Sequence, residues 1–367
     1  MQCVVVCNTL LFNVLLIFAY GSCVCAHLAQ VRYVQETCAE MRIIMNIYLA
    51  GDSIVQNYTD EEFIAGWGQY LPYYVNKDTK VVNCAKGGRS SRLFINEGRF
   101  DEIEKNIGEG DYLLIEFCHN DDASKEYKTM FNRLVELGEP DKNGRFPVIP
   151  GEKVSKDYIP EEYIEALMKD DSIKDKESVI QSVKAVNNSY PHDTYYPYSK
   201  NGEKGSYKWF IKQYIDMARE HKAIPILVTA PARTQFTEDG KIEDGRGLHG
   251  GNNFAYIRAM KQIGEETHTV VLDLFSYSVA MFESIGQADI HKYTSIKRGI
   301  NKGKWPDDFI KELNKPDTVS ENTHFNKYGA WLLTKGLVSL IKQCSDKQIE
   351  GLKGVITDSG FSVKKPF

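Results

Sequence analysis

The chain is poor in several features that would assign it to a particular class of protein. Its 45 basic and 50 acidic residues give a formal net charge of −5, and they form no long basic run. A nucleic-acid partner is therefore not expected, because such proteins carry a clustered basic footprint. Beyond residue 40, no apolar stretch approaches the ~20 residues of a membrane-spanning helix, so no stable span is expected there. No metal-ligand spacing occurs either, so the sequence does not suggest a metal site.

Cysteine is scarce outside the first forty residues. Of the eight cysteines, only Cys84, Cys118 and Cys344 lie beyond that region. Three widely spaced cysteines form no disulfide framework, and they fit a reducing compartment slightly better than an oxidising one.

Residues 1–40 differ from the rest of the chain, and two interpretations of them stay open. Residues 4–20 are mostly apolar and lead into small residues at 21–26, as in a signal peptide, although no Lys or Arg precedes them. Alternatively, residues 1–40 are an extension outside the natural coding sequence, and translation starts at Met41 or Met45. The first interpretation predicts a secreted protein and the second a cytoplasmic one.

Residues 41–345 alternate between two hydrophobic patterns. Strand-like segments occupy 43–50, 80–85, 111–118, 224–230 and 269–274. Helix-like segments occupy 93–107, 207–221, 254–267 and 328–344. The alternation predicts an α/β domain with a parallel sheet covered by helices on both faces. Residues 346–367 are predicted to be a C-terminal tail.

Residues 122–205 interrupt this alternation and are predicted to be an insertion. The segment is rich in Lys, Asp, Glu, Pro and Tyr, with short helices expected at 126–136 and 160–168. It is either a solvated insertion packed on the sheet edge or a lid, since long insertions are often functional. In the second case, tyrosines near its end, among them Tyr195 and Tyr196, would stack on sugar rings.

The first predicted strand ends at Gly51-Asp52-Ser53, the position where open α/β sheets carry their chemistry. All three residue types are common in turns, so Ser53 is either a nucleophile or a turn residue. A serine nucleophile needs a base, usually a histidine oriented by a carboxylate. Of the eight histidines, only His324 combines a carboxylate three residues upstream, Glu321, with a position just before a long helix. Asp52 is expected to hold the turn by accepting backbone N–H bonds.

Two further strand ends carry groups that suit ester chemistry. Gly88 follows the second predicted strand, and Asn120 follows the third. A glycine lets the backbone approach closely, and an asparagine amide donates hydrogen bonds to a developing negative charge. His119, next to Asn120, is a candidate for a structural or substrate-side role.

Together these segments resemble the SGNH (GDSL-type) hydrolases, and in particular their rhamnogalacturonan acetylesterase branch. The similarity covers roughly residues 45–343, interrupted by the insertion. It is carried by these blocks: Gly51-Asp52-Ser53, Gly66-Trp67-Gly68-Gln69, residues 83–92, Phe117-Cys118-His119-Asn120-Asp121, Val228-Thr229-Ala230-Pro231 and residues 323–330.

The resemblance implies a flavodoxin-like fold, a three-layer αβα sandwich around a central, mostly parallel five-stranded sheet. It implies a serine esterase that removes O-acetyl groups from carbohydrate, such as rhamnogalacturonan, through an acyl-enzyme and without a cofactor. Ser53 would attack the ester carbonyl, and His324 would take its proton. The backbone N–H groups of Ser53 and Gly88 and the side chain of Asn120 would form the oxyanion hole.

Two departures from the family pattern leave alternatives open. The family usually has Asp where this chain has Glu321, so the acid behind His324 is Glu321, Asp317 or no strong acid at all. Cys118 replaces a usual glycine, either narrowing the floor of the site or serving as a small buried hydrophobe. The alternative functions are a lipid or lysophospholipid esterase of the same fold, and a glycan-binding module with impaired catalysis.

Substrate-binding candidates carry more than one interpretation. Arg89 and Arg92 would suit the carboxylate of an anionic sugar such as galacturonate, because a guanidinium binds carboxylates in a bidentate manner. Internal ion pairs are the alternative for both arginines. His119, Tyr195 and Tyr196 complete the set of candidates.

Overall fold

The computed structural model describes residues 45–122, 133–150, 205–243, 253–296, 303–316 and 320–357, together with Lys169 and Glu177. All of them belong to a unit that begins at Met45. The predicted signal peptide, the insertion helix at 160–168 and the tyrosines Tyr195 and Tyr196 lie outside the described residues. Of the insertion helix expected at 126–136, only 133–136 are described, and they are not α-helical.

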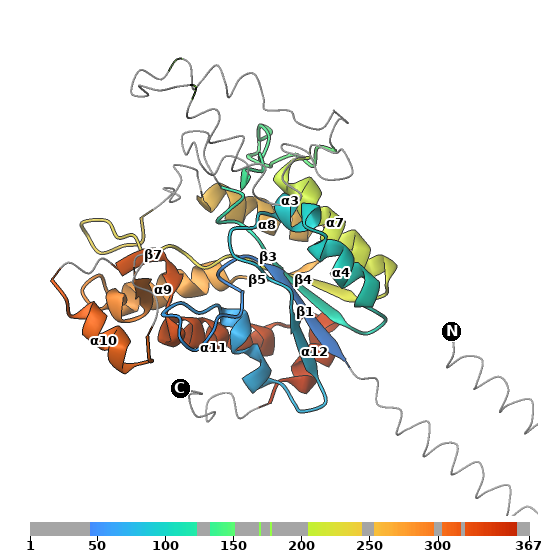
Figure 1. The fold of residues 1–367 in the computed structure, drawn as a ribbon. Helices are drawn as coiled ribbons and strands as arrows, with labels where there is room; N and C mark the ends of the chain where they lie inside the picture. The colour runs from blue at the N-terminus through green and yellow to red at the C-terminus, as the bar shows by residue number, and fades with distance from the viewer. Residues whose placement is uncertain are drawn as a thin grey trace, which may run out of the picture. The chain divides into compact units, whose positions relative to one another are not determined.

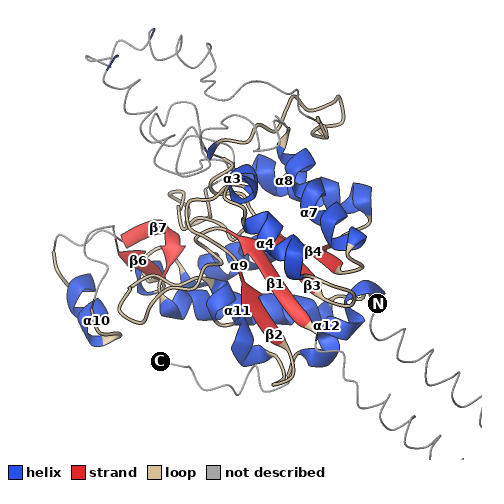
Figure 2. Cartoon of the chain, turned by 45° about the vertical axis from the view of Figure 1, so that its right-hand side comes forward, coloured by secondary structure: helices blue, strands red, loops and turns tan. Residues whose placement is uncertain are grey.

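A five-stranded sheet with the order β2-β1-β3-β4-β5 forms the centre of the domain. Every neighbouring pair in it is parallel. The strands are β1 (Asn46–Gly51), β2 (Lys80–Asn83), β3 (Tyr112–Glu116), β4 (Ile224–Val228) and β5 (Val270–Leu272). β1 and β3 are almost entirely buried apolar runs, as expected of parallel strands covered on both faces. The predicted α/β sandwich is therefore confirmed (Figure 2).

Helices cover the two faces of this sheet (Figure 1). One face carries α3 (Ser91–Asn96), α4 (Arg99–Asn106), α7 (Tyr207–Glu220) and α8 (Asn253–Thr267). The other carries α9 (Leu274–Ile285), α11 (Lys327–Gln343) and α12 (Glu350–Val355). No helix among the described residues has both the length and the apolar character needed to cross a membrane.

The helix predicted at 93–107 is in fact two helices, α3 and α4. Gly98 separates them with a φ of 76°, a left-handed conformation that side chains other than glycine rarely adopt. Ser90 begins α3, since its side chain accepts a hydrogen bond from the Leu93 backbone N–H. The apolar spacing continues through both helices, and periodicity alone therefore did not reveal the break.

A separate antiparallel pair, β6 (Thr294–Ile296) and β7 (Ser320–Phe325), was not predicted (Figure 2). The short helix α10 (Asp307–Leu313) lies between them in the chain. The sequence of β7 is mostly polar and lacks a strand pattern, and its conformation depends on pairing with a segment more than twenty residues away. His324 therefore lies on a strand, rather than on the turn that its spacing from Glu321 suggested.

The chain beyond residue 345 is not only a tail. Residues Lys347–Ile349 form a 3-10 turn that leads into α12, and Ile349 and Leu352 are fully buried. Ile356 then forms a β-bridge with Val75, and the Thr357 N–H donates to the Tyr74 carbonyl at 2.9 Å. This segment has too few apolar side chains for the sequence pattern to identify it as part of the core.

The order of the strands locates the site. From β1 the chain moves to β2 on one side and then returns to β3 on the other side. In open α/β sheets, the crevice for ligands lies outside the carboxyl ends of the strands at such a reversal. The segments after β1 and β3 contain Ser53 and Asn120.

Candidate active site

Ser53 lies directly after β1 in a turn that Asp52 holds. Asp52 Oδ1 accepts a hydrogen bond from the Ile54 N–H at 2.9 Å, and its backbone oxygen accepts from the Gln56 N–H at 3.1 Å. The Tyr58 hydroxyl donates to the Ser53 carbonyl at 3.0 Å. These bonds confirm the predicted role of Asp52 in holding the turn. They also fix the backbone conformation at Ser53.

Gly51 allows the end of β1 to pack this closely. A Cβ atom at this position would lie 2.6 Å from Val55 Cγ2 and 3.0 Å from the Glu116 carbonyl oxygen. Neither distance leaves room for a side chain. The end of β1 packs here against both the turn that follows it and β3. The glycine is therefore required by packing.

Ser53, His324 and Glu321 form a continuous chain of hydrogen bonds. Ser53 Oγ lies 2.8 Å from His324 Nε2, and His324 Nδ1 lies 2.6 Å from Glu321 Oε1. Because a carboxylate only accepts, Nδ1 carries the hydrogen, and in the neutral imidazole Nε2 is free to accept from the serine hydroxyl. The second carboxylate oxygen of Glu321 accepts from Ser295 Oγ at 3.0 Å. Asp317, the alternative acid, lies outside the described residues.

The strand that carries His324 is held from two sides. On one side the Ala65 N–H donates to the Phe325 carbonyl at 2.9 Å, and on the other the Thr234 N–H donates to the Asn322 carbonyl at 2.8 Å. Arg233, a buried residue after β4, donates to Thr323 Oγ1. The position of His324 is therefore set by the loops that follow β1 and β4.

Gly88 and Asn120 lie on the other side of Ser53. Gly88 has a φ of 83°, and a Cβ on the preceding Gly87 would be 3.3 Å from the Ser53 Cβ, so this glycine turn packs against the serine. Asn120 Nδ2 donates to Asp52 Oδ2 at 3.0 Å, which leaves its second hydrogen available. Within the described residues, no acceptor is bonded to the backbone N–H of Ser53 or Gly88. Within the part of the chain that the structure describes, the N–H groups of Ser53 and Gly88 and one hydrogen of the Asn120 amide therefore have no acceptor.

Comparison with known proteins agrees with this arrangement. A Bacillus subtilis protein named probable rhamnogalacturonan acetylesterase YesY is 30% identical over 299 residues, which cover 81% of this chain and 93% of the relative. The chain belongs to the rhamnogalacturonan acetylesterase-like branch of the SGNH hydrolases. It is therefore an enzyme of the carboxylic ester hydrolase class.

This SGNH hydrolase is also similar to more distantly related proteins. Rhamnogalacturonan acetylesterase RhgT of B. subtilis is 26% identical over 296 residues, covering 80% of this chain and 88% of the relative. A crystal structure of B. subtilis YxiM aligns with 82% of this chain and 56% of its own, at 22% identity and a TM-score of 0.48. No family model matches the chain.

At the end of β3 and just after it, this SGNH hydrolase buries a layer of acidic side chains. Burial raises the pKa of Asp121 to about 8 and that of Asp122 to about 7. Burial, followed by the nearby charges of Asp52 and Asp121, raises the pKa of Glu116 well above its ordinary value. Glu116 is fully buried, and neither of its carboxyl oxygens has a hydrogen-bond partner among the described residues. At neutral pH this layer therefore holds protons that the unfolded chain would release.

The raised pKa values of these buried carboxyl groups predict that the free energy of unfolding depends on pH. Glu116→Gln should weaken this dependence. A carboxyl group with a raised pKa contributes stability that is complete below its ordinary pKa, and this stability is lost as pH rises through the raised pKa. We expect the free energy of unfolding of the native enzyme to fall between pH 5 and pH 9. In Glu116→Gln the free energy of unfolding should fall less steeply with pH. The slopes of the two proteins should differ by up to about 1.4 kcal/mol per pH unit, the value for one proton. Urea unfolding at several pH values measures both slopes.

Glu102→Gln is the matched control for this experiment. Glu102 is an exposed glutamate on α4, so its loss should leave the slope of the native enzyme unchanged. Parallel slopes for the native enzyme and Glu116→Gln would show that Glu116 does not hold a proton in the folded state.

Several other predicted site residues are engaged elsewhere in this SGNH hydrolase. The Arg89 guanidinium is paired with Glu97, Nε at 2.8 Å from Oε1, which is the internal ion pair considered as its alternative role. His119 is buried, with Nε2 3.0 Å from the Pro231 carbonyl oxygen. Cys118 is a buried member of the core, and burial raises the pKa of its thiol.

Two residues at the site were not predicted from the sequence. Ser295 on β6 donates to Glu321, and Arg133, from the insertion, donates from Nη1 to Asn120 Oδ1 at 3.1 Å. Neither belongs to a motif, and both are brought to the site by segments distant in sequence. No local signal would have identified them.

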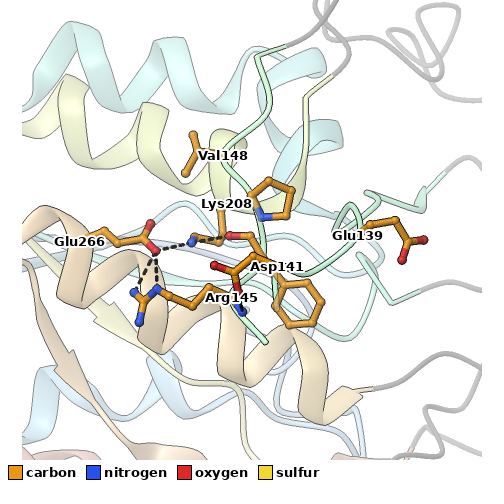
Figure 3. A pocket seen from close by; sticks show the side chains of 8 residues that line it. Glu139, Asp141, Arg145, Val148, Lys208 and Glu266 are labelled. Carbon is orange, nitrogen blue, oxygen red and sulfur yellow. Dashed lines mark hydrogen bonds and ion pairs between the residues drawn. The ribbon is translucent and has the colours of Figure 1, made fainter. Parts of the chain in front are cut away.

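A surface pocket of about 410 Å³ lies elsewhere on this SGNH hydrolase (Figure 3). Its two cations converge on one carboxylate, with Lys208 Nζ 2.6 Å and Arg145 Nη2 2.9 Å from Glu266 Oε1. None of the site residues lines this pocket. Among the described residues, no cluster of His, Cys, Asp or Glu side chains is arranged to hold a metal ion.

Proposed function

We propose that this enzyme is a serine esterase that removes O-acetyl groups from carbohydrate, and from rhamnogalacturonan in particular. The observation that supports it best is the hydrogen-bond chain from Ser53 through His324 to Glu321. At the carboxyl end of the sheet, Ser53 also lies close to the Gly88 turn and the Asn120 amide, whose remaining donors bond no acceptor among the described residues. A hydroxyl bonded to a base that a carboxylate orients is the arrangement of an activated nucleophile.

In the first half of the proposed reaction, Ser53 Oγ attacks the carbonyl carbon of the acetyl ester. Its proton passes to His324 Nε2, and Glu321 stabilises the resulting imidazolium. The negative charge moves to the carbonyl oxygen, where the N–H groups of Ser53, Gly88 and Asn120 stabilise it. The sugar oxygen then leaves with the proton from His324, and the acetyl group stays on Ser53.

The second half repeats these steps with water. His324 takes a proton from the water molecule, whose oxygen attacks the acetyl carbonyl carbon. Collapse of the tetrahedral intermediate returns the proton to Ser53 Oγ and releases acetate. Asn120 serves in both halves, because its amide is fixed by Asp52 and Arg133 before substrate binds.

The substrate class is proposed from the relatives. YesY and RhgT carry rhamnogalacturonan acetylesterase in their names, and the similarity extends over about four fifths of this chain. An acetyl group is small, which agrees with a serine that is only 8% exposed.

Acetate release from two polymers tests this proposal. We expect the enzyme to release acetate faster from acetylated rhamnogalacturonan than from acetylated xylan, and Ser53→Ala to release none above background. A series of p-nitrophenyl esters of increasing chain length should show a maximum at acetate. A maximum at long acyl chains would instead indicate a lipid esterase, and glycan binding without hydrolysis of any acetate would indicate a binding module.

A further inference from the structure

Arg133 lies against both of the residues that we assign to oxyanion stabilisation beyond the serine itself. Its Nη1 donates to Asn120 Oδ1 at 3.1 Å. A Cβ atom on Gly88 would lie 3.2 Å from Arg133 Nη2 and 3.3 Å from its Cζ. The guanidinium therefore lies beside the Gly88 turn and the Asn120 amide at once.

The backbone that carries Arg133 is anchored two residues further along. The Val135 N–H donates to the Asp121 carbonyl at 3.1 Å, and the Val135 carbonyl accepts from the Tyr256 hydroxyl at 2.8 Å. The Glu136 carbonyl accepts from the Tyr207 N–H at 2.8 Å. Val135 itself is buried. This part of the insertion is thus attached to the loop after β3 and to α7 and α8, and it presents Arg133 from a fixed position.

The charge of Arg133 is not neutralised by an acid in the part of the chain that the structure describes. Its hydrogen bond to Asn120 is its one side-chain interaction there. Arg89, two residues after Gly87, is by contrast paired with Glu97. A guanidinium has five N–H donors, and the described residues engage only the Arg133 donor that bonds Asn120.

Arg133 also determines which way the Asn120 amide points. A guanidinium can only donate, so it must face the amide oxygen. The amide nitrogen is then directed to Asp52 Oδ2, at 3.0 Å, and its second hydrogen is left for a substrate oxygen. A flipped amide would place its nitrogen against Arg133 and lose both hydrogen bonds.

We propose that Arg133 is a positioning residue of the esterase reaction: it holds the Asn120 amide with its N–H toward the oxyanion. This inference rests on the proposed function, because it assigns Asn120 to the oxyanion hole.

The test is a double-mutant cycle with p-nitrophenyl acetate, a small neutral ester that presents no sugar or carboxylate to bind. Arg133→Gln should lower kcat by about 10-fold to 100-fold with little change in KM, less than the ~10²–10³ of losing a donor outright. Arg133→Lys should recover part of the loss. In an Asn120→Ala background, Arg133→Gln should cost less than about 2-fold, because the group that it positions is gone.

Arg145→Gln is the matched control, since it removes the same charge from the same described segment but lies at the separate surface pocket. It should leave kcat unchanged, and thermal unfolding of each variant establishes that it is folded. Equal losses from Arg133→Gln in both backgrounds would overturn the inference. So would an effect confined to KM on an anionic glycan, which would indicate binding of a substrate carboxylate. A native enzyme inactive on every acetyl ester would instead overturn the proposed function.

Discussion

Replacing Ser53 with alanine is expected to lower kcat for acetyl-ester hydrolysis by about 10⁴-fold to 10⁶-fold. Ser53 Oγ is the hydroxyl bonded to His324 Nε2, at 2.8 Å, and alanine has no atom that can form the acyl-enzyme. The residual rate would come from the oxyanion donors and from binding alone. Initial rates of acetate release measure the loss. Mass spectrometry after rapid acid quenching should find one added acetyl group on the native enzyme and none on Ser53→Ala.

Ser345→Ala is the control for this change. Ser345 is exposed and follows α11, so removing its hydroxyl should alter neither kcat nor the mass of the trapped enzyme. Turnover by Ser53→Ala equal to that of the native enzyme would show that another group is the nucleophile.

The second large effect is expected at Glu321. Glu321→Gln should lower kcat by about 10⁴-fold, because an amide cannot stabilise the imidazolium and favours the wrong histidine tautomer. The carboxylate now lies 2.6 Å from His324 Nδ1 and accepts a hydrogen bond from Ser295 at its other oxygen. Kinetics on p-nitrophenyl acetate measure this loss without interference from glycan binding.

Glu321→Asp tests the length of this side chain separately from its negative charge. Glu321 Oε1 lies 2.6 Å from His324 Nδ1, within direct hydrogen-bond distance. Removing one methylene shortens the side chain by about 1.5 Å, so aspartate should fall short of the imidazole and kcat should drop. We expect this drop to be smaller than that of Glu321→Gln, because the negative charge remains nearby.

Native activity in Glu321→Gln would contradict the role assigned to this carboxylate. Asp317→Asn would then be the next variant to measure, since Asp317 is the other acid that the sequence places close to His324. Loss of activity in Asp317→Asn together with native activity in Glu321→Gln would assign the acid to Asp317.

Much of the fold was predictable because local patterns govern it. The five strands of the sheet contain apolar segments that are followed by turn residues, and α7, α8 and α11 have one apolar face each. Their predicted bounds agree with the structure to within a few residues. The α3–α4 break at Gly98 was missed because the apolar spacing runs through it, whereas a single backbone angle decides it.

The sequence by itself determined the order of the five sheet strands and of the helices α7, α8 and α11, and it placed Ser53, Gly88 and Asn120 at strand ends. Each of these features depends on neighbours in the chain. Only the tertiary structure decided how His324 meets Ser53, since β7 takes its position from Ala65 and Thr234. The same is true of the contact between Arg133 and Asn120, which depends on where the insertion attaches to the core. Such contacts join segments far apart in sequence, and no local pattern encodes the distance between them.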